Sequence, residues 1–290
     1  MKGYLAFVLH AHLPYVHHPE YETFLEERWL FEGILETYIP LLRMAESLKK
    51  DKIPFRLTLS LSPPLLNMLA DIHLKEKFQN HLLGLIELSQ KEIIRTKGTP
   101  FEALAKLYHN QFLQTLDFWT VWEGNLIEAF KQQQDSFEFI TTCATHGFLP
   151  AYREYPQAIG SQIRIGMEYF YSQMGFYPKG MWLPECAYFP GLDKILYQEG
   201  VGYFFVERHG LQYACPMPEN GVYSPIYTPE GVAVFGRDPL SSEKVWSGEV
   251  GYPGHPYYRE FYRDVGYDLD FEYVKPYINP DGMRCNTGIK

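Results

Sequence analysis

Polar residues that could do chemistry follow several short apolar runs of this sequence. His10 and His12 end the first run, His146 follows a later one, and Glu185 lies in the segment GMWLPECAY. The other members of this set are Thr145, Glu207, His209, Arg237 and Asp238. Imidazole, guanidinium and carboxylate groups hydrogen-bond polar ligands, and a carboxylate can also act as a nucleophile or as a general acid or base. The pattern predicts one polar site assembled from distant parts of the chain.

Glu185 is the strongest candidate for a catalytic side chain. It comes directly after Pro184, whose ring fixes its own φ and restricts the residue before it. Such a stiff bend could hold a carboxylate toward a ligand, whereas the alternative is an acid exposed in an ordinary turn. We expect Glu185 at the centre of the site.

His10 and His12 form a His-x-His pair that is open to more than one interpretation. The pair could ligate a metal, hydrogen-bond a substrate or fill a core. A metal-dependent barrel hydrolase would need further ligands from His146, His209 or Asp238. We favour substrate binding or core filling, so no metal and no other cofactor is expected.

The apolar runs predict strands of a parallel sheet, because most are nearly continuous rather than alternating. They cover residues 4–10, 55–61, 137–143, 180–183, 202–206 and 231–235. Helical patterns lie between them at residues 29–49, with a kink at Pro40, and at residues 156–174 and 191–199. This alternation predicts an α/β fold, most plausibly a barrel with its working residues at the carboxyl ends of the strands.

A long helical stretch interrupts the predicted barrel. Residues 64–134 greatly exceed one crossover helix and predict an inserted helical subdomain, with residues 1–63 and 135–290 forming the barrel. The part from Asp238 onward is rich in Gly, Pro, Ser and Tyr and predicts ordered loop. We expect the chain to be truncated within a domain.

Composition narrows the classes of partner. The net charge of −9, without a basic stripe, argues against nucleic acid, and the 17% aromatic content favours a ligand-binding surface. No apolar run is long enough to span a membrane, and no export signal is recognised. The four cysteines form no C-x-x-C pair, so we expect free thiols and a cytoplasmic location. The sequence carries no signal of an oligomeric state.

Five segments together resemble glycoside hydrolase family 57. In chain order they are HAHLPY, EERWLFE, ATHGFLP, GMWLPECAY and VWSGEVGYPG. The chain is most similar to the N-terminal portion of the family's α-1,4-glucan branching enzymes and related α-amylase-like members. The resemblance implies an incomplete seven-stranded (β/α) TIM-like barrel with a helical insertion, truncated here before a helical C-terminal domain.

The resemblance also implies roles for individual residues. Glu185 would be the nucleophile of a retaining reaction without a metal, His10 and His146 would hold the sugar, and Trp29 and Trp246 would line the groove. With the strand-end analysis, the expected substrate-binding set is His10, His12, Trp29, His146, Trp182, Tyr188, Arg237, Asp238 and Trp246. The expected substrate is an α-1,4-glucan such as amylose or a glycogen-like polysaccharide.

Two departures from the family pattern bear on activity. The family's general acid is an aspartate within a Tyr/Phe-Asp-x-Glu-Leu-Phe-Gly-His-Trp-Trp segment, which does not occur here, and neither Asp238 nor Asp264 matches it. We therefore expect negligible turnover, with a non-catalytic glucan-binding fragment as an alternative. The segment from Val206 to Val232 is shorter than in branching members, which favours hydrolysis as another alternative. Its tyrosines, Tyr213, Tyr223 and Tyr227, match no position of the longer loop.

Overall fold

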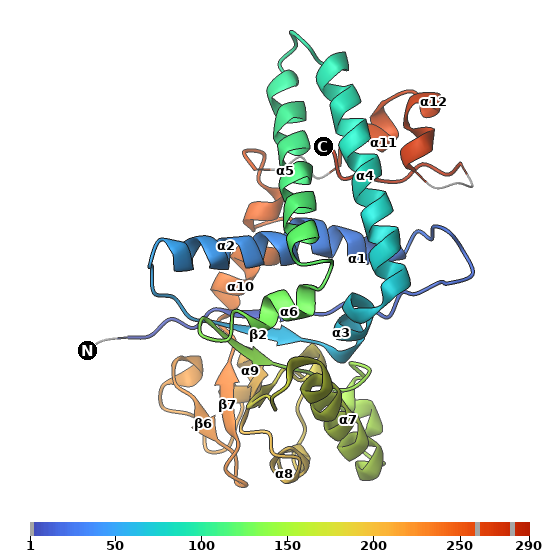
Figure 1. Cartoon of the computed structure of the whole chain (residues 1–290). Coiled ribbons are helices and arrows are strands. Elements are labelled where there is room, and N and C mark those ends of the chain that lie inside the picture. Colours follow the sequence, from blue (N-terminus) through green and yellow to red (C-terminus); the bar gives the residue numbers. More distant parts are fainter. Residues whose placement is uncertain (1–2, 259–261, 279–281) are drawn as a thin grey trace. The chain divides into compact units, whose positions relative to one another are not determined.

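The computed structural model describes residues 3–258, 262–278 and 282–290 (Figure 1). Its contacts divide the chain into two compact units. The strand unit comprises Met1–Pro14, Phe55–Asn67 and Lys131–Pro253, and the helical unit comprises Tyr15–Pro54, Met68–Phe130 and Gly254–Lys290. Residues 15–54 and 254–290 thus group with the long helices, although the predicted boundaries assign them to the barrel. The predicted domain limits stay a prediction.

The strand unit is built on parallel strands. One sheet has the order β1-β2-β3, the other β4-β5-β7-β6, and a parallel bridge between Thr141 and Met181 links β3 to β4. Among the strands of the described residues, only β6 runs antiparallel, paired with β7. The strands are β1 (Val8–Ala11), β2 (Leu57–Leu61), β3 (Phe137–Ile140), β4 (Gly180–Met181), β5 (Tyr203–Val206), β6 (Ile226–Tyr227) and β7 (Ala233–Gly236). The predicted parallel α/β arrangement is confirmed.

Helices of the strand unit pack on these strands around a shared core. Helix α7 (Pro156–Met174) has the predicted limits and begins with proline, where the missing N–H costs little. Its buried Ile163 and Met167 belong to one cluster with Phe204 of β5. The others are α8 (Leu192–Gln198), α9 (Arg208–Gln212), α10 (Pro239–Trp246) and the 3-10 helices η2 (Leu149–Tyr152), η3 (Pro184–Cys186) and η4 (Gly221–Tyr223).

Two expectations about this unit are wrong in detail. Strand β1 begins at Val8 rather than at residue 4, and the apolar side chains of residues 4–7 before it are exposed. The segment after Asp238 opens with helix α10 instead of loop. Asp238 caps this helix by accepting a hydrogen bond from the Ser241 N–H, and Pro239 occupies the first turn. An N-cap aspartate followed by proline is a helix start signal that outweighs the loop-like composition beyond it.

The helical unit consists mainly of one hairpin of two long helices, with several shorter helices. Helices α4 (Ile72–Arg95) and α5 (Glu102–Val121) lie side by side and antiparallel (Figure 1). The other elements are α1 (Glu27–Gly33), η1 (Ile34–Tyr38), α2 (Ile39–Lys50), α11 (Val265–Asp268), α12 (Phe271–Val274) and η6 (Lys275–Tyr277). Helices α3 (Pro63–Ala70) and α6 (Leu126–Lys131) and the 3-10 helix η5 (Tyr252–Gly254) lie where the chain passes between the units. No helix among the described residues has the length and apolarity to cross a membrane.

The predicted kink at Pro40 takes the form of a local change in helix type. Residues Ile34–Tyr38 form a π-helical segment, and Pro40 falls in the first turn of α2. Because proline lacks an N–H and its ring clashes with the preceding turn, a regular α-helix cannot continue through it. The wider π turn that precedes α2 accommodates the proline.

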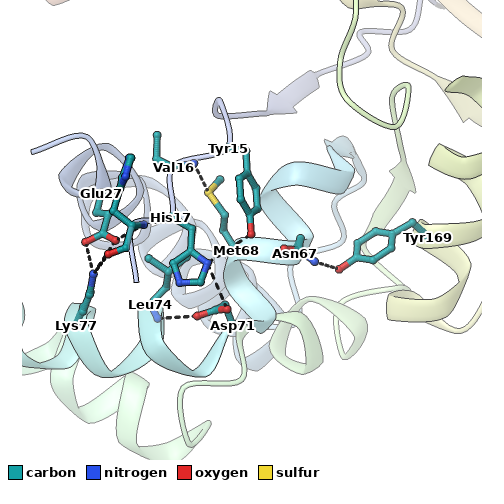
Figure 2. Close-up of polar contacts among 11 residues, drawn as sticks. Tyr15, Val16, His17, Glu27, Asn67, Met68, Asp71, Leu74, Lys77 and Tyr169 are labelled. Carbon is teal, nitrogen blue, oxygen red and sulfur yellow. Dashed lines mark hydrogen bonds and ion pairs between the residues drawn. The ribbon is translucent and has the colours of Figure 1, made fainter. Parts of the chain in front are cut away.

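Buried charges tie the helical unit together. Glu27 is fully buried, and Lys77 Nζ donates to both of its carboxylate oxygens at 2.8 and 2.9 Å (Figure 2). Arg28, also buried, donates to the carbonyl oxygens of Tyr277 and Asn286, both at 3.1 Å. Charges taken out of water must be paired in this way. The first turn of α1 therefore anchors both α4 and the C-terminal segment.

Candidate active site

Three of the predicted histidines and a tryptophan form a stack at the carboxyl ends of the strands. The ring centroids of His12 and His146 are 3.8 Å apart, and those of His10 and His146 are 5.1 Å apart. Trp182 lies 4.6 Å from His10 with an angle of 11° between the rings. Strands β1, β3 and β4 thus bring together side chains separated by up to 172 residues of sequence.

Each imidazole of the stack meets a buried hydroxyl. The Nδ1 atoms lie at hydrogen-bond distance from hydroxyl oxygens in the pairs His10–Ser60 (3.0 Å), His12–Ser62 (3.0 Å) and His146–Thr142 (2.9 Å). All three hydroxyl residues have no exposed surface. The hydroxyls therefore fix the orientation of the rings from beneath.

The loop that carries His146 is held by α7. The Ala144 N–H donates to the Gln162 carbonyl at 2.8 Å, and the Thr145 N–H donates to Gln162 Oε1 at 3.0 Å. Gly166 allows the close approach, because a Cβ there would come within 2.5 Å of the Thr142 carbonyl oxygen. His146 itself has φ of 53°, a left-handed conformation that non-glycine residues rarely adopt.

Glu185 lies on an unusual backbone turn. It and Cys186 have φ of 56° and 51°, so two consecutive non-glycine residues are left-handed. Such conformations cost free energy and concentrate at functional sites. The Glu185 side chain is exposed, and its negative charge raises the pKa of His12 against the effect of burial. The carboxylate is therefore near enough to His12 for its charge to act on that imidazole, and it is open to a ligand.

Arg237 completes this group from β7. Its guanidinium carbon lies 5.5 Å from the Trp182 ring centroid, so the indole contacts both Arg237 and His10. Arg237 pairs with Glu207, which follows β5. Its neighbour in the sequence, Asp238, instead caps α10.

The histidines of the stack are held neutral. Burial lowers the pKa of His10 to about 2, aided by His146, His12 and Arg237. Burial likewise lowers the pKa of His12 and of His146 to about 4 each. Neutral imidazole offers one N–H donor and one nitrogen acceptor. The stack thus presents hydrogen-bonding groups without adding positive charge.

We expect acid to destabilise the chain through these histidines. Above about pH 6.5 they are neutral in both the folded and the unfolded chain, so their contribution is fully present. As the pH falls toward about 5, the unfolded chain binds protons that the folded chain does not, and stability is lost. The midpoint temperature of thermal unfolding, measured by circular dichroism, should fall as the pH is lowered over this range. In the His12→Gln variant this midpoint should fall less steeply with pH. A midpoint with the same slope in both proteins would contradict this assignment.

The other predicted site residues have different surroundings. Tyr188 stacks on Phe204 with 5.4 Å between centroids and donates its hydroxyl to Asp193 at 3.2 Å. Trp246 is 68% exposed at the end of α10, in the same unit as the stack. Trp29 is 47% exposed on α1 of the helical unit, so it is not a core residue. Trp246 and Trp29 both present free indole surface.

Sequence reasoning missed the hydroxyls beneath the histidines. Ser60 and Ser62 end the second strand, and the rule that selected polar residues after the other strands applies equally to them. Thr142 was passed over in favour of Thr145, which instead contacts Gln162. Small polar residues in an apolar run give a weak signal, because a buried serine is as compatible with packing as with function.

The arrangement does not favour the metal interpretation of the His-x-His pair. The three rings stack face to face, and each Nδ1 is directed to a hydroxyl. Across the described ranges, no group of three or more His, Cys, Asp or Glu side chains is placed to hold a metal ion. Cys143, Cys186 and Cys215 are free thiols, as predicted. Burial raises the pKa of the Cys186 thiol, next to Glu185, to about 11, so it is protonated.

Several solved structures are similar to this chain. The α-amylase AmyC from Thermotoga maritima is 51% identical, with a TM-score of 0.95 over 100% of this chain and 56% of that chain. The GH57-type branching enzyme from Pyrococcus horikoshii is 35% identical, with a TM-score of 0.83 over 91% and 52%. TK1436, a GH57 branching enzyme from Thermococcus kodakaraensis solved in complex with glucose and additives, is 34% identical, with a TM-score of 0.81 over 91% and 52%. These likenesses confirm the predicted incomplete (β/α) barrel with a helical insertion.

The same family relationship is found in sequence. The curated 1,4-alpha-glucan branching enzyme TK1436 is 34% identical over an alignment 295 residues long, which covers 91% of this chain and 42% of that protein. The chain therefore spans about half the length of the relatives it matches. Residues 6–275 match the sequence profile of glycosyl hydrolase family 57, and the chain belongs to that family.

Proposed function

We propose that this chain carries the nucleophile of an enzyme that processes α-1,4-glucan, with Glu185 attacking the anomeric carbon. The observation that carries the proposal is the left-handed turn at Glu185 and Cys186, which holds an exposed carboxylate whose charge acts on His12. Strain of this kind persists only where the surroundings enforce it. The family relationship and the glucose complex of TK1436 support a sugar as the ligand.

The neutral histidine stack suits the proposed chemistry. Glycoside cleavage passes through a transition state with oxocarbenium-ion character, so positive charge near the anomeric carbon opposes it. His10, His12 and His146 would hydrogen-bond sugar hydroxyls without adding such charge, and Arg237 is balanced by Glu207. Trp182 would support the stack, since its ring packs against both His10 and the Arg237 guanidinium.

We propose branching as the overall reaction, through a covalent glycosyl-enzyme with retention of configuration. The similarity to the curated branching enzyme TK1436 supports it. Hydrolysis is the second candidate, supported by the 51% identity to AmyC. The segment after β5, which is shorter than in branching members, also supports hydrolysis. It folds as the short elements α9, η4 and β6, and its tyrosines Tyr213, Tyr223 and Tyr227 are all exposed. Branch-point analysis of amylose treated with enzyme distinguishes the two.

The proposed partner of the Glu185 nucleophile, a general acid, has no matching motif in residues 1–290. We therefore propose negligible turnover of natural glucans by residues 1–290, because the leaving groups of these glucans require protonation. A glycogen-like polysaccharide is the proposed substrate. The cytoplasmic location stays a prediction of the sequence.

A substrate with a good leaving group tests the nucleophile separately from the acid. With α-maltosyl fluoride, the Glu185 carboxylate forms a bond to the anomeric carbon while the C–F bond breaks and fluoride departs with its electron pair, so no proton is needed. We expect mass spectrometry to find a maltosyl adduct on the peptide that contains Glu185. Glu185→Gln should remove the adduct. Glucan binding without any adduct would instead favour the non-catalytic alternative.

A further inference from the structure

The hydroxyls beneath the histidine stack determine more than ring orientation. Ser60 and Thr142 are fully buried, and among the described residues each hydroxyl has a single hydrogen-bond partner, the Nδ1 of His10 or of His146. A hydroxyl is one donor with two acceptor lone pairs, and a neutral imidazole has one protonated and one bare nitrogen. The direction of each hydrogen bond is therefore a choice between two tautomers.

Burial decides that choice. If Nδ1 carried the proton and donated to the hydroxyl, the buried O–H of Ser60 or Thr142 would have no acceptor. If the hydroxyl donates, its hydrogen is used and Nδ1 must be bare, which places the imidazole proton on Nε2. Unpaired buried donors are the costlier defect, whereas an oxygen with spare lone pairs is tolerated. For His146 the donating arrangement leaves no buried donor unpaired, whereas for His10 it moves the unpaired donor from the Ser60 hydroxyl to the buried Nε2.

The third pair, His12 and Ser62, also favours a hydroxyl that donates to Nδ1. Ser62 Oγ accepts the Leu65 N–H at 3.3 Å, as the cap of α3, and lies 3.0 Å from His12 Nδ1. One lone pair is thus taken by the backbone and a second stays available, but among the described residues only a bare His12 Nδ1 gives the buried hydroxyl hydrogen an acceptor. The Nε2 of His10 is buried with no hydrogen-bond partner in the described parts of the chain. A proton there makes it a donor for an acceptor that a ligand would supply.

We propose that Ser60, Ser62 and Thr142 are positioning residues that set His10, His12 and His146 as neutral Nε2–H donors. The inference rests on the proposed function for its purpose, since three such donors would bind oxygen atoms of a sugar without charge. Their tautomers are a property of the free protein and can be measured without any sugar. The depressed pKa values of the three histidines agree with this assignment.

The helical unit contains a matched pair with the opposite direction. Ser89 Oγ lies 3.0 Å from His109 Nδ1, but its hydroxyl donates to the Ile86 carbonyl at 2.9 Å. Its hydrogen is already used, so Ser89 must accept from His109, and the same accounting places that proton on Nδ1. The same protein is thus expected to contain histidines of both neutral tautomers, Nε2–H in the stack and Nδ1–H at His109.

Long-range ¹H–¹⁵N correlation spectra of the ¹⁵N-labelled 290-residue chain test the proposal. We expect the Nε2–H pattern for the three stacked histidines and the Nδ1–H pattern for His109, each assigned by its His→Gln variant. Ser60→Ala and Thr142→Val should shift the imidazole above them toward mixed tautomers and leave the others unchanged. Ser161→Ala, which removes an exposed hydroxyl on α7, should change none of them.

Binding of maltohexaose provides the functional readout. Ser60→Ala and Thr142→Val should each weaken it about fivefold, the effect of one neutral hydrogen bond, whereas Ser161→Ala should not. Nδ1–H patterns for the stacked histidines, or patterns unmoved by the hydroxyl variants, would overturn the proposal. The expected tautomers in a chain that binds no maltohexaose would contradict the proposed function and leave the tautomer assignment standing.

Discussion

Glu185→Gly should make the protein more stable and chemically inactive at once. The native residue has φ of 56°, which glycine adopts without the steric cost of a side chain, so the free energy of unfolding should rise by about 1 kcal/mol. Labelling by α-maltosyl fluoride should vanish, because the attacking carboxylate is gone. Urea unfolding followed by tryptophan fluorescence, with mass spectrometry on the same samples, measures both effects.

Lys52→Gly is the matched control for the backbone term. Lys52 has φ of 57° in an exposed turn of the helical unit, so its replacement should raise stability similarly and leave labelling intact. Glu185→Gln removes the charge but keeps the strained backbone, and should abolish labelling without the gain in stability. A Glu185→Gly protein that is less stable than the native chain would contradict the claim that the backbone at Glu185 is strained.

The outcome for Glu185 illustrates which features a sequence can reveal. Pro184 and the position after a strand end are local, and they were sufficient to single out this residue. The left-handed turn was not predictable, since neither Glu185 nor Cys186 favours it and only tertiary packing can impose it. The partnership of Arg237 with Glu207 was likewise hidden, because it depends on β5 and β7 lying side by side.

The fold shows the same division. Helix α7 could be placed to the residue, because its initial proline and its periodicity agree. Strand β1 was overextended, because apolar residues 4–7 satisfy a strand pattern while their surroundings leave them exposed. Helix α10 was missed when composition was weighed over the cap at Asp238. Helix start signals and periodicity predict an element reliably where they agree. Whether a given apolar segment is buried depends on tertiary packing, which the local sequence does not contain.

Asp264 shows why a carboxylate cannot be assigned to catalysis by position alone. The sequence left it as an unmatched acid, but the structure buries it completely in the helical unit. Its Oδ1 accepts from the Gly266 N–H, the Thr287 N–H and the Thr287 hydroxyl at 2.8, 2.8 and 2.9 Å, and its Oδ2 accepts from the Gly288 N–H at 2.9 Å. The carboxylate is occupied in fastening the C-terminal residues to α11.

Asp264→Ala should therefore cost about 3–5 kcal/mol of unfolding free energy, because four donors lose their acceptor. Asp264→Asn keeps one acceptor oxygen and should cost about 1–3 kcal/mol. Hydrogen exchange in residues 282–290 should accelerate in the same order. Asp270→Ala, which removes an exposed cap of α12, should cost only about 1 kcal/mol. The folded Asp264→Asn variant should still be labelled at Glu185. Loss of labelling without loss of stability would contradict the structural role and indicate that Asp264 takes part in the chemistry.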